Sequence, residues 1–139
     1  MVRVFLSHNW GSDGAVHGRV LELASTLKDR GLDVWVDEDR MRGNIVDCMC
    51  DGIDQCDVFL VFVTRSYLHK VQFGGDGDNV RREFMYAQSL GKQMLAVRFD
   101  ETLPRRWPGP VGMMLGSSLY VDLSDPTVDN VDAIIRIVR

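Results

Sequence analysis

The sequence predicts an α/β fold built on a buried parallel sheet, and three stretches carry this prediction. Val58–Val63 (VFLVFV) is an unbroken apolar run of β-branched and aromatic residues. A strand that is apolar on both faces must be covered on both faces, which is typical of a central strand in a parallel sheet. Val2–Leu6 and Met94–Phe99 have the same character, and helical patterns lie between the runs. In such sheets ligands bind outside the carboxyl ends of the strands.

The first half of the chain alternates strands and helices. Val2–Leu6 is the first predicted strand. Apolar residues at helical spacing then predict a helix with Ser12 or Asp13 as its N-cap and Gly31 at its end. Leu32–Val36 is short and rich in valine, which favours a second strand. A second helix, Asn44–Gln55, follows, with inward-facing positions at Ile45, Cys48, Met49, Gly52 and Ile53.

The second half continues the alternation after the central strand. A helical turn is predicted at Ser66–Val71, and Val80–Leu90 is predicted as a helix capped by Asp76 or Asp78 and ended by Gly91. The remaining predicted elements are a strand at Gln93–Phe99, a short helix at Val111–Leu115, an edge strand at Leu119–Asp122 and an amphipathic helix at Thr127–Val138.

Composition narrows the classes of function. A chain of 139 residues is one domain, and its abrupt ends suggest a domain cut from a longer protein. The net charge of −4 argues against a nucleic-acid partner, and no apolar run is long enough to cross a membrane. The odd cysteine count (Cys48, Cys50 and Cys56) and the lack of a signal peptide favour a cytoplasmic setting, with the cysteines as small core residues.

Several sites are excluded by their spacing. Cys48-x-Cys50 has neither a second cysteine pair nor nearby histidines, so no metal site is expected. The glycine-rich stretch 72–79 lacks the lysine of a phosphate-binding P-loop and the acidic twelfth position of an EF-hand. A phosphorylatable receiver domain needs an aspartate after the third strand, where Val63-Thr64-Arg65 stands instead.

Five motifs together resemble the TIR (Toll/interleukin-1 receptor) domain family. They are VFLSHNW, DVWVDEDRMRGN, DVFLVFVTRSYL, VRREFMYAQSLGKQMLAV and WPGP, in the family's order and over nearly the whole chain. The resemblance implies a flavodoxin-like, five-stranded parallel sheet with helices on both faces. It also implies docking onto other TIR domains through the BB loop, matched here by Asp39, Arg40, Met41, Arg42 and Gly43.

The resemblance extends to the TIR domains that cleave NAD⁺ between nicotinamide and ribose. Their catalytic glutamate is matched here by Glu83 in Arg82-Glu83-Phe84-x-x-Ala87. A carboxylate suits this chemistry because bond cleavage develops positive charge on the ribose, as in glycoside hydrolysis. NAD⁺ is then a substrate, and no cofactor or metal is required. The implied substrate-binding residues are Asp37, His8, Asn9, Trp10 and Asn79, the last standing where some of these enzymes place an aromatic residue.

Each candidate site residue also has a simpler structural interpretation. Glu83 can be a solvated helix residue paired with arginines, and Asp37 can simply terminate its strand. His8 can be a structural residue, and Trp10 a packed loop aromatic. His17 and His69 are expected at the surface, and Trp35 in the core. For the whole domain the alternative to an enzyme in signalling, cell death or defence is a non-catalytic TIR adaptor that acts by docking. An aromatic pocket wall from Trp10 or Trp107 favours the enzyme.

Overall fold

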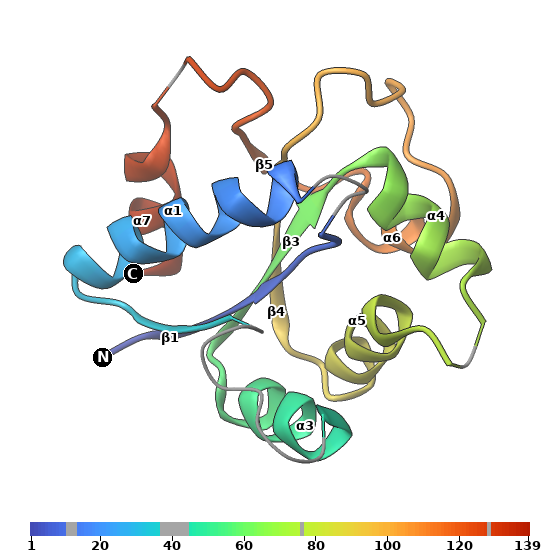
Figure 1. Cartoon of the computed structure of the whole chain (residues 1–139), viewed down its shortest axis with the longest axis horizontal. Coiled ribbons are helices and arrows are strands. Elements are labelled where there is room, and N and C mark those ends of the chain that lie inside the picture. Colours follow the sequence, from blue (N-terminus) through green and yellow to red (C-terminus); the bar gives the residue numbers. More distant parts are fainter. Residues whose placement is uncertain (11–13, 37–44, 76, 128) are drawn as a thin grey trace.

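The computed structural model describes residues 1–10, 14–36, 45–75, 77–127 and 129–139. Its five strands form one parallel sheet in the order β2-β1-β3-β4-β5 (Figure 1). The strands are β1 (Arg3–Ser7), β2 (Asp33–Trp35), β3 (Val58–Val63), β4 (Gln93–Arg98) and β5 (Tyr120–Asp122). The helices are α1 (Ala15–Asp29), α3 (Ile45–Gln55), α4 (Arg65–Phe73), α5 (Asn79–Ser89), α6 (Gly109–Leu115) and α7 (Val131–Val138).

This architecture is the predicted flavodoxin-like sheet with helices on both faces. The sheet separates two apolar cores, and α1 and α7 cover one face while α3, α4, α5 and α6 cover the other (Figure 1). Successive side chains of a strand point to opposite faces. In β3, Val58, Leu60 and Phe62 therefore enter the first core, and Phe59, Val61 and Val63 enter the second. This is the physical reason for its lack of alternation in sequence.

Element bounds differ from the sequence prediction mainly at short elements. The predicted turn after β3 is a nine-residue helix, α4, because the Thr64 hydroxyl accepts a hydrogen bond from the Tyr67 amide and caps its start. The edge strands β2 and β5 are only three residues long. Gly31 and Gly91, predicted to end helices, have φ of 92° and 68°. Ser12 and Asp13 lie outside the described residues, and Gly14 occupies the N-cap of α1.

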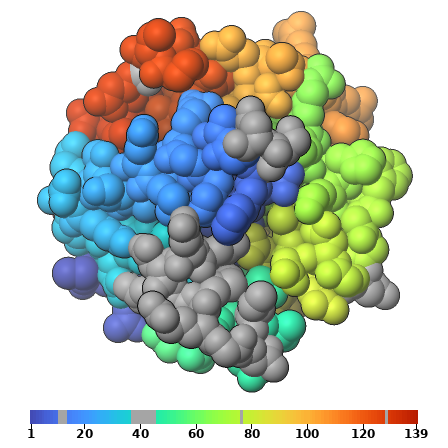
Figure 2. All heavy atoms as spheres, in the orientation of Figure 1, coloured from blue at the N-terminus to red at the C-terminus, as the bar shows by residue number. Residues whose placement is uncertain are grey.

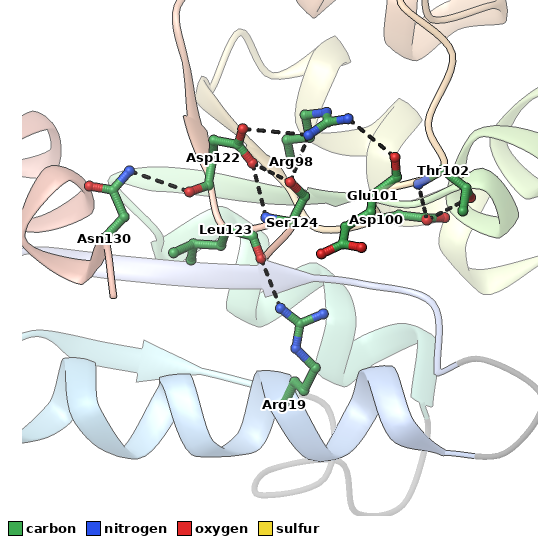
Figure 3. Close-up of polar contacts among 9 residues, drawn as sticks. All are labelled: Arg19, Arg98, Asp100, Glu101, Thr102, Asp122, Leu123, Ser124 and Asn130. Carbon is green, nitrogen blue, oxygen red and sulfur yellow. Dashed lines mark hydrogen bonds and ion pairs between the residues drawn. The ribbon is translucent and has the colours of Figure 1, made fainter. Parts of the chain in front are cut away.

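Arginine side chains tie the carboxyl ends of β4 and β5 to their surroundings (Figure 3). Arg19 of α1 donates to the Phe99 carbonyl at 3.3 Å and to the Leu123 carbonyl at 2.8 Å, and its guanidinium lies over the Phe99 ring. Arg98 at the end of β4 donates to the Ser124 hydroxyl at 2.6 Å (Figure 3). These bonds fix the loops on which ligands of such sheets are expected to lie.

The cysteines are only in part the predicted core residues. Cys56 is buried, and this burial raises its pKa to about 11, whereas Cys48 and Cys50 are half-buried on α3. Trp35 packs against the second core, as predicted. Within the described ranges, no helix has both the length and the apolar character needed to cross a membrane.

Candidate active site

Glu83 lies inside the protein rather than on its surface. It sits on α5, which begins where the Asp78 carboxylate accepts hydrogen bonds from the amides of Val80 and Arg81. Its exposed fraction is 2%, although it stands beside the apolar stripe of the helix. A carboxylate is rarely buried without polar partners, because transfer from water costs far more than helix packing returns. The solvated interpretation of Glu83 is therefore wrong.

A chain of short hydrogen bonds holds the Glu83 carboxylate. The Ser7 hydroxyl at the end of β1 donates to Glu83 Oε1 at 2.6 Å and lies 2.7 Å from the Tyr67 hydroxyl of α4. A serine hydroxyl has one proton, so once it donates to the carboxylate it can only accept from tyrosine. The order is therefore Tyr67 to Ser7 to Glu83. A short O–H···O hydrogen bond of this kind fixes the orientation of the carboxyl group that accepts it.

Glu83 also lines a surface groove of about 410 Å³ between α3 and α5. The groove has an almost wholly apolar lining, to which Arg82 and Glu83 add charge. Its other lining residues are Val46, Met49, Cys50, Ile53, Met85 and Tyr86. A cavity of this size with few polar groups is the usual form of a small-molecule site. The aromatic wall comes from Tyr86 rather than from Trp10 or Trp107.

The loop after β1 contains a second buried polar group, a histidine pair. His8 Nε2 lies 2.7 Å from Nδ1 of His17, and His8 Nδ1 lies 3.4 Å from the Leu6 carbonyl. Because a carbonyl only accepts, His8 carries its proton on Nδ1 and accepts from His17 through Nε2. Burial lowers the pKa of His8 to about 4, so His8 is neutral at pH 7. It supports the loop and is no general acid at that pH.

Trp10 lies at the surface beside this pair. Its ring stacks on His17 with the centroids 3.7 Å apart and an angle of 12° between the planes, and 47% of the residue is exposed. The prediction that His17 lies at the surface is wrong, because His17 fills the space between His8 and Trp10 and is buried. Figure 2 shows the segment after β1 reaching the surface between α1 and the yellow-green α5.

The structure brings together only some of the predicted site residues. Asn9 is half-buried, and Asn79 is exposed on α5, one helical turn before Glu83 and on the same side. Asp37, a predicted substrate-binding residue, and the predicted docking residues Asp39, Arg40, Met41, Arg42 and Gly43 lie outside the described residues.

Ser7 and Tyr67 lie within the motifs VFLSHNW and DVFLVFVTRSYL, but neither motif indicates a contact with Glu83, and His17 lies in none of the five motifs. Ser7 and Tyr67 are separated by 60 positions, and Ser7 and Glu83 by 76. The order of the strands does indicate that Ser7 and Tyr67 lie close together. β1 and β3 are neighbours in this topology, so Ser7 at the end of β1 and α4, which follows β3, lie at the same edge of the sheet.

A family model for the TIR domain matches residues 4–138. The chain belongs to the TIR domain family. Solved structures agree with this at the level of the fold. The TIR domain of the Toll-related receptor TRR-2 from Hydra magnipapillata is 17% identical, with a TM-score of 0.66 over 98% of this chain and 97% of that chain. A prokaryotic SEFIR domain is 18% identical, with a TM-score of 0.68 over 99% and 98%.

This TIR domain is also similar in fold to a protein named for an enzymatic activity. The Clostridium botulinum CMP N-glycosidase BcmB is 16% identical, with a TM-score of 0.60 over 96% of this chain and 98% of that chain. A search of curated proteins gave no match. Because all these identities are below one fifth, the structural similarities establish the TIR domain's architecture alone.

Proposed function

We propose that this TIR domain is an NAD⁺ glycohydrolase with Glu83 as its catalytic residue. The observation that carries the proposal is the buried Glu83 carboxylate, held by Ser7 at 2.6 Å on the wall of a groove that a small molecule can enter. A carboxylate fixed in a largely apolar setting stabilises positive charge more strongly than one in water.

In the proposed reaction the C1′–N bond of the nicotinamide riboside half breaks. Its electron pair leaves with nicotinamide, which departs as a neutral base. Glu83 stabilises the cationic ribose in the transition state, and water attacks C1′ with loss of a proton, which yields ADP-ribose. A cyclic product forms if the adenine of the same molecule attacks instead. Hydrolysis of N-glycosidic bonds passes through the same kind of charge as glycoside hydrolysis.

The predicted substrate-binding residues have different parts in this proposal. Asn79, one turn before Glu83, and Asn9 offer amides to the ribose hydroxyls or the phosphates. Trp10 offers the ring face that His17 does not cover to an aromatic base. His8 acts through the loop that it anchors. Asp37 binds substrate, and residues 39–43 dock onto a second copy that completes the pocket.

Two observations support this assignment without deciding it. The similarity to a CMP N-glycosidase means that a protein of this fold is named for cleavage of the same type of bond in a nucleotide. The three-member chain Tyr67–Ser7–Glu83 orients a carboxylate, which a purely structural helix does not require.

The deciding experiment measures nicotinamide release from NAD⁺ by concentrated protein, with Glu83→Gln beside Glu22→Gln. Glu22 lies exposed on α1, so its substitution removes the same charge away from the groove. We expect a loss of about 10²- to 10³-fold for Glu83→Gln, the size seen when one transition-state stabiliser is removed, and none for Glu22→Gln. Turnover that survives Glu83→Gln in folded protein refutes the mechanism.

The second candidate, a non-catalytic assembly module, is favoured by large apolar side chains on the surface. Leu119 is 87% exposed and Phe73 is 65% exposed. Each of these exposed apolar side chains is a candidate contact with a partner. Light scattering on Leu119→Ser and Phe73→Ser tests this role. Assembly lost in these variants, together with wild-type protein that assembles but releases no nicotinamide, would establish the module over the enzyme.

A further inference from the structure

A second cavity, unrelated to Glu83, lies beside α6. It measures about 860 Å³ and is formed by the loop after β4, by α6 and by the start of β5. Among the residues that the structure describes, none lines both this cavity and the groove beside Glu83. Its volume falls within the range of small-molecule sites.

The lining of this cavity is strongly basic. Arg98, Arg105 and Arg106 all line it, and none of its described lining residues is an aspartate or a glutamate. The chain as a whole carries a net charge of −4, so Arg105 and Arg106, with no acid among the described lining residues, are a local concentration of positive charge. Guanidinium groups bind phosphate oxygens through paired hydrogen bonds, so the charge and its chemical type favour a phosphate ligand.

The three arginines are not equivalent. Arg98 is already engaged, because it lies 3.4 Å from the Asp122 carboxylate and donates to the Ser124 hydroxyl at 2.6 Å and to the Glu101 carbonyl at 3.5 Å (Figure 3). Arg105 and Arg106 are exposed and have no hydrogen-bond or ion-pair partner in the described part of the chain. Arg105 and Arg106 are therefore the two cations available to bind an anion, while Arg98 is held in the cavity lining by its own bonds.

The cavity also has two aromatic walls set at an angle. The rings of Trp107 and Tyr120 have centroids 5.7 Å apart and planes inclined by 57°. Trp107 packs against the second core, and Tyr120 is partly exposed on β5. The rings form an open corner in which a flat base can lie against one ring and present its edge to the other. Stacking on such rings accepts any base.

The backbone holds these groups in place. Arg105, Arg106 and Trp107 stand between Pro104 and Pro108, which restrict the φ angles of the loop. Gly112 of α6 lies directly under this loop, because a Cβ atom there would be 1.7 Å from the Trp107 carbonyl oxygen. The loop backbone thus packs on α6, which fixes the positions from which Arg105, Arg106 and Trp107 extend.

We propose that this cavity binds a nucleoside diphosphate or a related nucleotide, with the phosphates on Arg105 and Arg106 and the base in the corner between Trp107 and Tyr120. This goes beyond the proposed function, since no described residue belongs to the lining of both this site and the Glu83 groove. We assign the nucleotide here as a ligand and not a substrate, because none of the described lining residues is a carboxylate.

ADP is a suitable probe because it has phosphates and a base but no nicotinamide. The three tryptophans report on separate places: Trp10 beside α1, Trp35 on β2 and Trp107 in the cavity. Their indole N–H signals in a nitrogen-labelled NMR spectrum are assigned by single Trp→Phe substitutions. We expect ADP to shift the Trp107 signal in a saturable manner, with the same dissociation constant in Glu83→Gln. A shift of the Trp10 signal alone would place ADP at the other site and overturn the proposal.

One double variant and one charge-matched control test the contacts between the arginines and the phosphates. Arg105→Gln/Arg106→Gln is expected to weaken ADP binding about tenfold or more, the equivalent of one lost charged contact. Lys28→Gln/Arg136→Gln removes the same charge from α1 and α7, on the other side of the molecule (Figure 1), and is expected to leave binding unchanged. If both double variants weaken ADP binding equally, the effect comes from the overall charge of the protein, and the proposal of a specific site is overturned.

Tyr120→Ala tests the aromatic corner. It is expected to weaken ADP several-fold and to leave the binding of pyrophosphate unchanged, because pyrophosphate has no base to stack. If pyrophosphate binds as tightly as ADP and Tyr120→Ala affects neither, the cavity is a simple anion pocket and the nucleotide assignment is wrong. Absence of any Trp107 shift at millimolar ADP in folded protein also overturns it.

Discussion

Ser7→Ala is the most informative single substitution, because it removes one oxygen atom at the centre of the Tyr67–Ser7–Glu83 chain. The Ser7 side chain is fully buried, and alanine keeps the Cβ atom, so no large cavity is created. The proposed mechanism requires an ionised Glu83, and a buried hydrogen bond to an ionised group is worth about 1.5–3 kcal/mol. With a urea slope of about 2 kcal/mol per molar, the unfolding midpoint falls by about 1 M.

A control and a second background make this prediction sharp. Ser89→Ala is the same chemical change on an exposed part of α5, where the hydroxyl donates only to the Tyr86 carbonyl, and it should cost less than about 0.5 kcal/mol. In a Glu83→Gln background the acceptor is neutral, so Ser7→Ala should cost only about 1 kcal/mol. The assay is urea unfolding of all four combinations at Ser7 and Glu83. An equal cost in both backgrounds would show that the Ser7 bond does not depend on the charge of Glu83, and would refute the reasoning.

Three further predictions concern stability. Burial lowers the pKa of His8 to about 4, whereas its value in the unfolded chain is near 6.5. Between these two pH values the folded protein binds fewer protons than the unfolded protein. The free energy of unfolding therefore falls by about 3 kcal/mol as the pH drops from 6.5 to 4. Urea unfolding across that range should show a flatter profile for His8→Gln. Gly112→Ala should destabilise the fold because its Cβ would overlap the Trp107 carbonyl. Gly18→Ala should stabilise the fold by about 0.5–1 kcal/mol, because Gly18 lies in α1 with open space around it. Thermal melts of the two variants test this difference. Asp78→Ala should cost about 1 kcal/mol as α5 loses its cap, and Asp78→Asn much less, in the same melts.

The fold could be predicted from the sequence because its main determinants are local. Unbroken apolar runs mark buried strands, and glycines such as Gly31 and Gly91 mark helix ends that need positive φ. The bounds of the short elements are predicted less accurately. The residues after Val63 form a full helix, and Asp33–Trp35 is shorter than the apolar run around it, because hydrogen bonding and not hydrophobicity sets these limits.

The candidate site was predictable only where a family motif marks it. The motif gives Glu83 as the candidate, but its burial depends on Ser7 and Tyr67, which approach it only in the folded chain. His17 was misplaced for the same reason, since its partner His8 lies across the loop before α1. Helical periodicity reports which side of a helix faces the sheet, and it says nothing about a polar group that a distant strand satisfies.

The two-sided burial of β3 affects the fidelity of folding. In a strand with one apolar face, a slip of one residue exposes its apolar side chains to water, and this penalty enforces the pairing. Val58–Val63 would lose little by such a slip, since both of its faces are apolar and both enter a core. The correct pairing must therefore be selected by polar anchors. Asp57, just before the strand, is bonded twice to Arg3: its amide donates to the Arg3 carbonyl at 2.7 Å, and its carboxylate accepts from the Arg3 amide at 2.9 Å. A chain lacking the Asp57 carboxylate would be prone to misaligned central strands, and Ser7 would then end opposite the wrong neighbour.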